Sequence, residues 1–87
     1  MTQPQASTPD EIAPVVVEWL DSTMGSTGWA PYAQLRAETL KPIRSSGFLL
    51  QETETLVTLV ASISGDRGAD TLLIPRGCVL NIRRLKE

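Results

Sequence analysis

The chain has 87 residues, the size of one small domain with a modest hydrophobic core. Its apolar content of 41% is too high for a chain that is disordered throughout, and no apolar run approaches the roughly 18 residues of a membrane span. The net charge of −2 argues against a general nucleic-acid binder, which usually carries a basic footprint. The single cysteine excludes an internal disulfide.

Charge is unevenly placed along the chain. Residues 1–40 contain one basic and five acidic side chains, whereas residues 41–87 contain seven basic and five acidic ones. The first part is therefore acidic and the second mildly basic. This pattern leaves room for a local basic patch near the C-terminal end.

The first residues offer little that could pack in a core. Residues 1–11 are rich in Gln, Pro, Ser and Thr, which predicts a flexible N-terminal tail. We expect residues 12–87 to form a single domain. Its first strand is predicted at residues 15–20, because β-branched residues and Trp favour extended backbone, with Val15, Val17 and Trp19 on one face.

A loop and the only helical candidate follow. Residues 21–28 contain Ser, Thr and two glycines but match neither phosphate-binding glycine motif, so we interpret them as a connecting loop. Residues 29–38 are predicted to be helical, since Pro31 suits a first turn and good helix formers follow it. We expect Trp29 to pack onto the mouth of the strand domain.

Two further strands are predicted in the middle of the chain. Residues 43–51 form the first, with Gly47 as the point where the strand bends. Residues 55–64 form the second, with Leu59 and Ala61 among the side chains that face the core. A glycine-bounded hairpin at residues 65–69 leads out of it.

The closing stretch, residues 70–85, contains two short apolar runs joined by Pro75, Arg76 and Gly77. This link suits a single turn of 3₁₀ helix between two strands, and alternation puts Cys78, Leu80 and Ile82 on one face. We therefore expect a mainly β fold, a small five-stranded SH3/Sm-like partly open barrel with one short helix between the first two strands.

Several segments together resemble small uncharacterised proteins of tailed bacteriophages and prophages. These segments are Val17–Asp21, Gly28-Trp29, Ser46–Leu50, Val57–Val60 and Ile74–Val79. The segment Ile74–Ile82 also resembles the end of Sm-like proteins, although the Sm-like RNA-binding signature is missing. The resemblance implies a phage origin and a barrel. It implies no activity. The single cysteine and the lack of a secretory signal pattern at the N-terminus predict a location in the cytoplasm, which for a phage protein is that of the host cell.

Residues that could carry catalysis are scarce. The chain has no histidine, so the commonest general base and metal ligand is absent, and its one cysteine has no histidine to activate it. We interpret Cys78 as a small buried hydrophobe. The prediction is a protein that is not an enzyme and that needs no cofactor or metal.

Two binding functions remain. The first is a protein-interaction or assembly module that forms homo-oligomers, with the chain itself as partner and a host or phage protein as a further one. Consecutive apolar residues in the strands motivate this hypothesis, because one of each pair must point away from the core. The predicted interface residues are Phe48, Leu50 and Leu73.

The alternative is a nucleotide- or nucleic-acid-binding Sm-like protein, such as one that sequesters a host signalling nucleotide. Arginines grip phosphates and aromatic rings stack on bases. The predicted ligand-binding residues are Arg76, Arg83, Arg84, Trp19, Trp29 and Tyr32. No membrane partner is expected.

Overall fold

The computed structural model describes residues 12–85, so the predicted N-terminal tail lies outside the described residues. The elements in chain order are β1 (Pro14–Trp19), α1 (Tyr32–Arg36), β2 (Ile43–Glu52), β3 (Leu56–Ser64), β4 (Arg67–Pro75), the 3₁₀ turn η1 (Arg76–Cys78) and β5 (Val79–Arg84). This confirms the prediction of a mainly β fold with five strands and one short helix between the first two strands.

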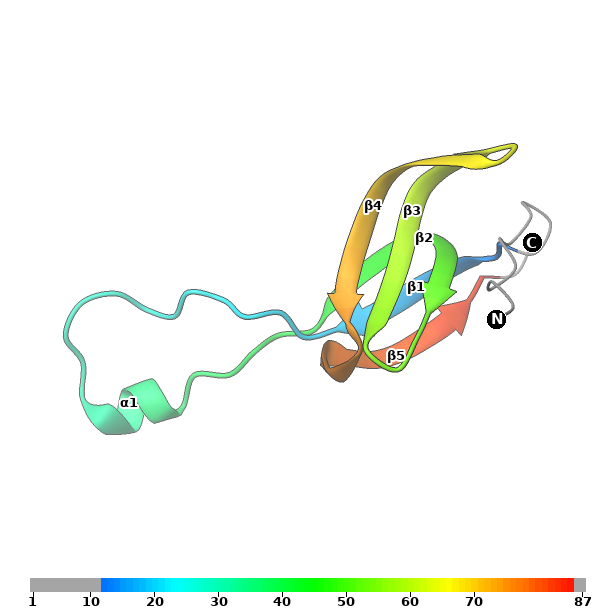
Figure 1. Ribbon diagram of the computed structural model, residues 1–87. Helices are drawn as coiled ribbons and strands as arrows, with labels where there is room; N and C mark the ends of the chain where they lie inside the picture. Colours follow the sequence, from blue (N-terminus) through cyan, green and yellow to red (C-terminus); the bar gives the residue numbers. More distant parts are fainter. Residues whose placement is uncertain (1–11, 86–87) are drawn as a thin grey trace.

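All five strands belong to one antiparallel sheet in the order β4-β3-β2-β1-β5. The sheet is strongly bent, so that β1 and β5 form one half and β3 and β4 the other (Figure 1). β2 belongs to both halves, because Phe48 pairs with Pro14 on one side and with Val60 on the other. The sheet is not closed into a barrel, since β4 and β5 are its two edges.

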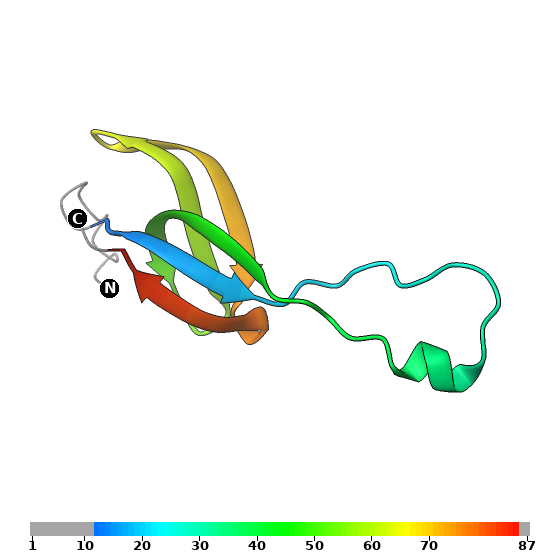
Figure 2. The ribbon, with the colours of Figure 1, turned by 180° about the vertical axis from the view of Figure 1, so that it is seen from behind.

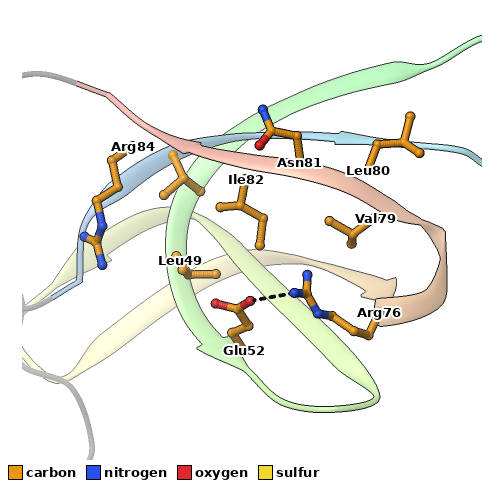
Figure 3. Close-up of a pocket in the computed structure, with 9 residues that line it drawn as sticks. Leu49, Glu52, Arg76, Val79, Leu80, Asn81, Ile82 and Arg84 are labelled. Atoms are coloured by element: carbon orange, nitrogen blue, oxygen red, sulfur yellow. Dashed lines mark ion pairs between the residues drawn. The ribbon is translucent and has the colours of Figure 1, made fainter.

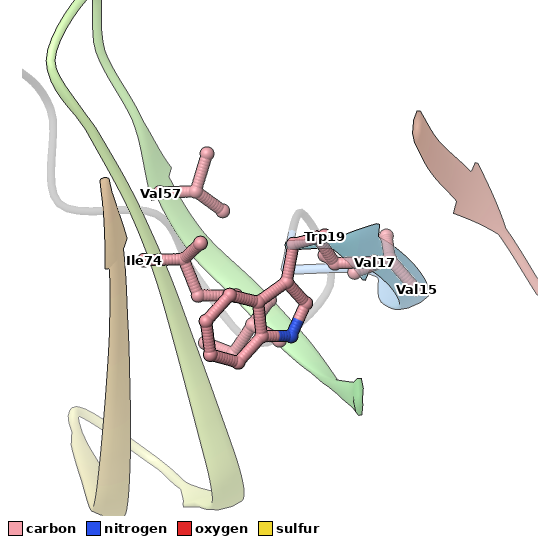
Figure 4. Packing of buried hydrophobic residues seen from close by; sticks show 6 residues of the cluster. Val15, Val17, Trp19, Val57 and Ile74 are labelled. Carbon is pink, nitrogen blue, oxygen red and sulfur yellow. The ribbon is translucent and has the colours of Figure 1, made fainter. Parts of the chain in front are cut away.

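The core lies between the two halves of the bent sheet. Val15, Val17 and Trp19 alternate with more exposed residues along β1, which confirms the predicted core face of this strand. Figure 4 shows the indole of Trp19 reaching from β1 toward Ile74 on β4. Leu59, which is 2% exposed, also belongs to this cluster.

Gly47 lies where the backbone of β2 passes close to β3. A Cβ atom at this position would lie 3.0 Å from the carbonyl oxygen of Val60 and 3.3 Å from the Cβ of Leu59. β2 curves through this region (Figure 2), and a register shift follows at Leu50, between Leu49 and Gln51. The absence of a side chain at Gly47 therefore lets the strand bend across the core without pushing β3 away.

The outer half of β3 departs from the predicted pattern. Ala61 is exposed, so its predicted position in the core is wrong. The reason is the bend of β2, which pairs with β3 only from Phe48 onward, opposite Val60. The first part of β2 pairs with β1, so residues 62–64 pair with β4 alone. The β3–β4 hairpin thus extends beyond the core, and both of its faces are accessible to solvent.

The end of the chain confirms the 3₁₀ turn but not the predicted face of the last strand. Leu80 is 53% exposed, whereas Val79 and Ile82 pack against the core. A register shift between Glu18 and Trp19 places Asn81 and Val79 opposite them, so Leu80 is the extra residue of a β-bulge. The bulge turns Leu80 outward, which alternation alone does not predict.

The helix is shorter than predicted. α1 has five residues and begins after Pro31, so Trp29 and Ala30 stay outside it. Trp29 is 105% exposed, and the prediction that it packs onto the sheet is wrong. A helix of little more than one turn presents no continuous apolar face, and no residue of α1 is buried.

Candidate functional site: an exposed arm and a hollow

The connection between β1 and β2, residues 20–42, forms an arm that projects from one end of the sheet (Figure 1). The arm contributes to an elongated shape, with extents of 54 × 33 × 20 Å. Connections in compact domains are usually about 4–6 residues long, and loops of more than about 12–15 residues are usually functional or linkers. The arm therefore calls for an explanation beyond joining two neighbouring strands.

The arm carries the most exposed large hydrophobic side chains among residues 12–85. Trp29 is 105% exposed, Met24 87% and Tyr32 76%. The guanidinium carbon of Arg36 lies 5.6 Å from the centre of the Tyr32 ring, a cation–π arrangement that leaves most of the ring accessible. The arm thus holds an apolar, aromatic surface that its own chain does not cover.

Two sets of contacts give the arm its shape. At its base, the backbone N–H of Leu20 donates to the carbonyl of Cys78 over 2.8 Å. Farther out, the backbone N–H and the hydroxyl of Ser26 both donate to one carboxylate oxygen of Glu38, the N–H over 2.9 Å. These hydrogen bonds, the hydroxyl's first, hold the pKa of Glu38 below its ordinary value. The two legs of the arm are thereby linked to each other.

A hollow of about 630 Å³ opens on the unclosed side of the bent sheet, between β5 and the end of β2. Its volume is within the range of ordinary ligand pockets. The residues that line the hollow are Val15, Leu49, Glu52, Arg76, Val79, Leu80, Asn81, Ile82 and Arg84.

The hollow has an apolar floor and a polar rim. Val79 and Ile82 point from β5 toward Leu49, and these three side chains form the open side of the hydrophobic core (Figure 3). Arg76 from η1 pairs with Glu52 from β2 at 3.2 Å, in an ion pair that spans the two walls of the hollow. The hollow is thus the place where the sheet fails to close over its core.

The structure does not gather the six predicted ligand-binding residues into one site. Arg76 and Arg84 line the hollow, whereas Arg83 lines a separate pocket of about 340 Å³ with Glu18 and Arg44. Trp19 is buried in the core, where its indole N–H donates to the Ser45 hydroxyl over 3.0 Å.

Trp29 and Tyr32, the remaining two, lie on the arm, away from the strands (Figure 1). The two arginines of the hollow therefore have no aromatic side chain beside them among its lining residues.

The three predicted interface residues are only partly covered by their own chain. Leu73 is 58% exposed, Leu50 is 41% exposed and Phe48 is half-buried. Leu72, next to Leu73 on edge strand β4, is also exposed, at 37%. Consecutive apolar residues thus leave accessible surface on the strands, although less per side chain than on the arm.

Other chemical sites are sparse in residues 12–85. This range contains no group of three or more His, Cys, Asp or Glu side chains that could hold a metal ion. Cys78 is half-buried and packs against the core cluster, in agreement with its interpretation as a small hydrophobe. No helix in the same range is long and apolar enough to cross a membrane.

Sequence reasoning missed Met24 and Leu40 as candidate interface residues. Both lie in the arm, and both are exposed, at 87% and 45%. Each is a single apolar residue in a polar setting, where periodicity gives no signal. The length of the connection, residues 20–42, was the available signal, because so long a link between neighbouring strands is unusual.

The comparisons with known proteins give no relationship: no family model, no curated protein and no solved structure matches this chain.

Proposed function

We propose that this chain is a non-catalytic assembly module that forms homo-oligomers through protein–protein contacts. The observation that carries the proposal is the arm, with Trp29, Tyr32 and Met24 held away from the sheet. Covering side chains of this size contributes about 1.5–3 kcal/mol each. An isolated chain leaves these side chains in water and does not gain this free energy. Binding of a partner that covers the arm does gain it.

The fold supports the same proposal. The strand order with a 3₁₀ turn before the last strand is in keeping with an SH3/Sm-like barrel that is open at one side. Both edge strands, β4 and β5, carry exposed leucines. Open edges of this kind favour association with another chain. We include in the proposal an origin in a tailed phage or prophage, with a host or phage protein as a further partner in the host cytoplasm.

The oligomeric state tests this proposal. We expect the wild-type chain to elute as an oligomer in size-exclusion chromatography with light scattering, and the double variant Trp29→Ala/Tyr32→Ala to elute as a monomer. The far-ultraviolet circular dichroism of the variant should match the wild type, because neither side chain is buried. A wild-type chain that stays monomeric at every concentration tested overturns the proposal.

A second candidate function is nucleotide or nucleic-acid binding. The observation that favours it is that Arg76 and Arg84 line the same hollow, where guanidinium groups could grip phosphate. The Glu52 carboxylate already pairs with Arg76, however, and competes with an incoming anion. Nucleotide absorbance in the supernatant of heat-denatured purified protein, lost in Arg84→Ala, supports this function, and a clean supernatant removes it.

A further inference from the structure

We propose that the arm of one copy docks in the hollow of a second copy of this chain, with Trp29 seated between β5 and the end of β2. The inference rests on the proposed function and adds to it the identity of the two surfaces that meet. Each surface has accessible apolar groups, and they lie at different places on the same chain.

The hollow has the make-up of an interface. Its floor, formed by Leu49, Val79 and Ile82, belongs to the core cluster but is only half-buried. Its rim carries Arg84 and the Glu52–Arg76 ion pair. An apolar centre surrounded by polar groups is the usual arrangement in protein–protein interfaces. A side chain bound here would cover the part of the core that the open sheet leaves exposed to solvent.

The arm supplies the area that such an interface needs. A stable interface buries about 800 Å² on each partner, and each large aromatic side chain contributes about 150–250 Å². Trp29 and Tyr32 together therefore provide about half of this area, and Met24 on the same arm is a third exposed apolar group.

Polar groups on the two surfaces also fit each other. A buried indole N–H or phenol O–H requires a hydrogen-bond partner. The rim of the hollow offers an acceptor in the Glu52 carboxylate. This carboxylate can accept from the indole N–H of Trp29 while it keeps its ion pair with Arg76, since a carboxylate has several acceptor positions.

The arm and the hollow of one chain do not meet each other. The arm leaves the sheet at the end of β1 and points away from every strand (Figures 1 and 2). Because the two surfaces are different, their contact between copies builds a ring or a filament, or joins two chains that exchange arms. In each of these assemblies every arm occupies the hollow of another copy.

Complementation between two variants tests the docking. Trp29→Ala removes the arm's anchor and keeps the hollow, whereas Leu80→Glu places a charge at the hollow and keeps the arm. Leu80 is 53% exposed, so its replacement should leave the fold intact. We expect each variant alone to be monomeric and an equimolar mixture to form a one-to-one heterodimer, measured by native mass spectrometry with a mass tag on one variant.

Leu73→Glu is the matched control, because Leu73 is 58% exposed on β4 and does not line the hollow. We expect this variant to assemble like the wild type. If it is monomeric while Leu80→Glu assembles, the β4 edge is the interface and the docking is wrong. If Leu80→Glu loses its circular dichroism signal, Leu80→Ser replaces it.

Two further outcomes separate this inference from the proposed function. An oligomeric wild type whose two variants do not complement each other overturns the docking but leaves homo-oligomeric assembly standing. A monomeric wild type overturns both.

Discussion

Asp70 has a left-handed backbone conformation, with φ of 62°, inside edge strand β4. It is the one non-glycine residue with positive φ in residues 12–85. The pairing with β3 is interrupted there, since Thr71 pairs with Val60 and Ala69 with Ser62. Aspartate tolerates this conformation better than most residues because its short side chain can hydrogen-bond locally.

A β-branched residue at this position should be strained. We expect Asp70→Val to lower the free energy of unfolding by about 1–2 kcal/mol, and Asp70→Gly to leave it unchanged or raise it. Urea denaturation measures both. Thr71→Val is the matched control, because it places the same side chain on the next exposed residue, where φ is negative. Equal losses for the two valines would show that backbone strain is not the cause.

The two tryptophans show when the position of a single residue can be predicted from the sequence. Trp19 alternates with two valines, and this local pattern was sufficient to predict its place in the core. Trp29 lies in a polar connection. It can pack on the sheet only if the arm turns back toward the strands. The path of the arm depends on the whole connection and not on the residues next to Trp29. The prediction made from those neighbouring residues was therefore wrong.

Among the elements, the arm contains a side-chain link that is sensitive to pH. Ser26 donates twice to the Glu38 carboxylate and lowers its pKa in the folded chain. The folded pKa is therefore below the unfolded one. The link stabilises the arm fully above the ordinary glutamate pKa and is lost as the pH falls through the lowered, folded value.

An NMR titration can follow this link. We expect the amide resonance of Ser26 to titrate with a midpoint below the ordinary pKa of glutamate, because protonation of Glu38 weakens the hydrogen bond that it reports. Ser26→Ala removes the hydroxyl, the larger cause of the shift, and should raise the pKa of Glu38 toward its ordinary value. A midpoint at the ordinary value in the wild type would contradict the link.

The strands could be predicted where the local sequence alone determines which residues are buried. The extents of β1, β2 and β3 and the 3₁₀ turn agree with the expected ranges to within one or two residues. The errors, Ala61 and Leu80, both arise from pairing. The bend of β2 away from β3 and the bulge opposite Glu18 depend on how distant segments pair, and local alternation carries no information on this.

For the candidate site, the sequence indicated the residue types but not their grouping. Arg76 and Arg84 come together because η1 and β5 form one wall of the hollow. Arg83 lies apart from them, since neighbouring residues of a strand point to opposite faces of the sheet. The hollow itself follows from the failure of the sheet to close, a property of its overall bend that no short segment contains.

At the scale of the whole molecule, stability depends on a small core between two halves of one bent sheet. Six buried residues form its central cluster, and the open side of that cluster is the hollow. A domain of this length has a free energy of unfolding of about 4–13 kcal/mol, at roughly 0.05–0.15 kcal/mol per residue. One well-buried side chain therefore carries a large share of it.

Leu59 provides the test of this dependence. Leu59→Ala should lower the free energy of unfolding by about 2–5 kcal/mol, because the side chain is 2% exposed and its removal leaves a cavity between the two halves of the sheet. Leu72, its direct partner on β4, is 37% exposed, so Leu72→Ala should cost clearly less. Both are measured by urea denaturation in the Trp29→Ala background, where loss of assembly cannot add to the effect. Equal costs would mean that the core does not lie where these strands place it.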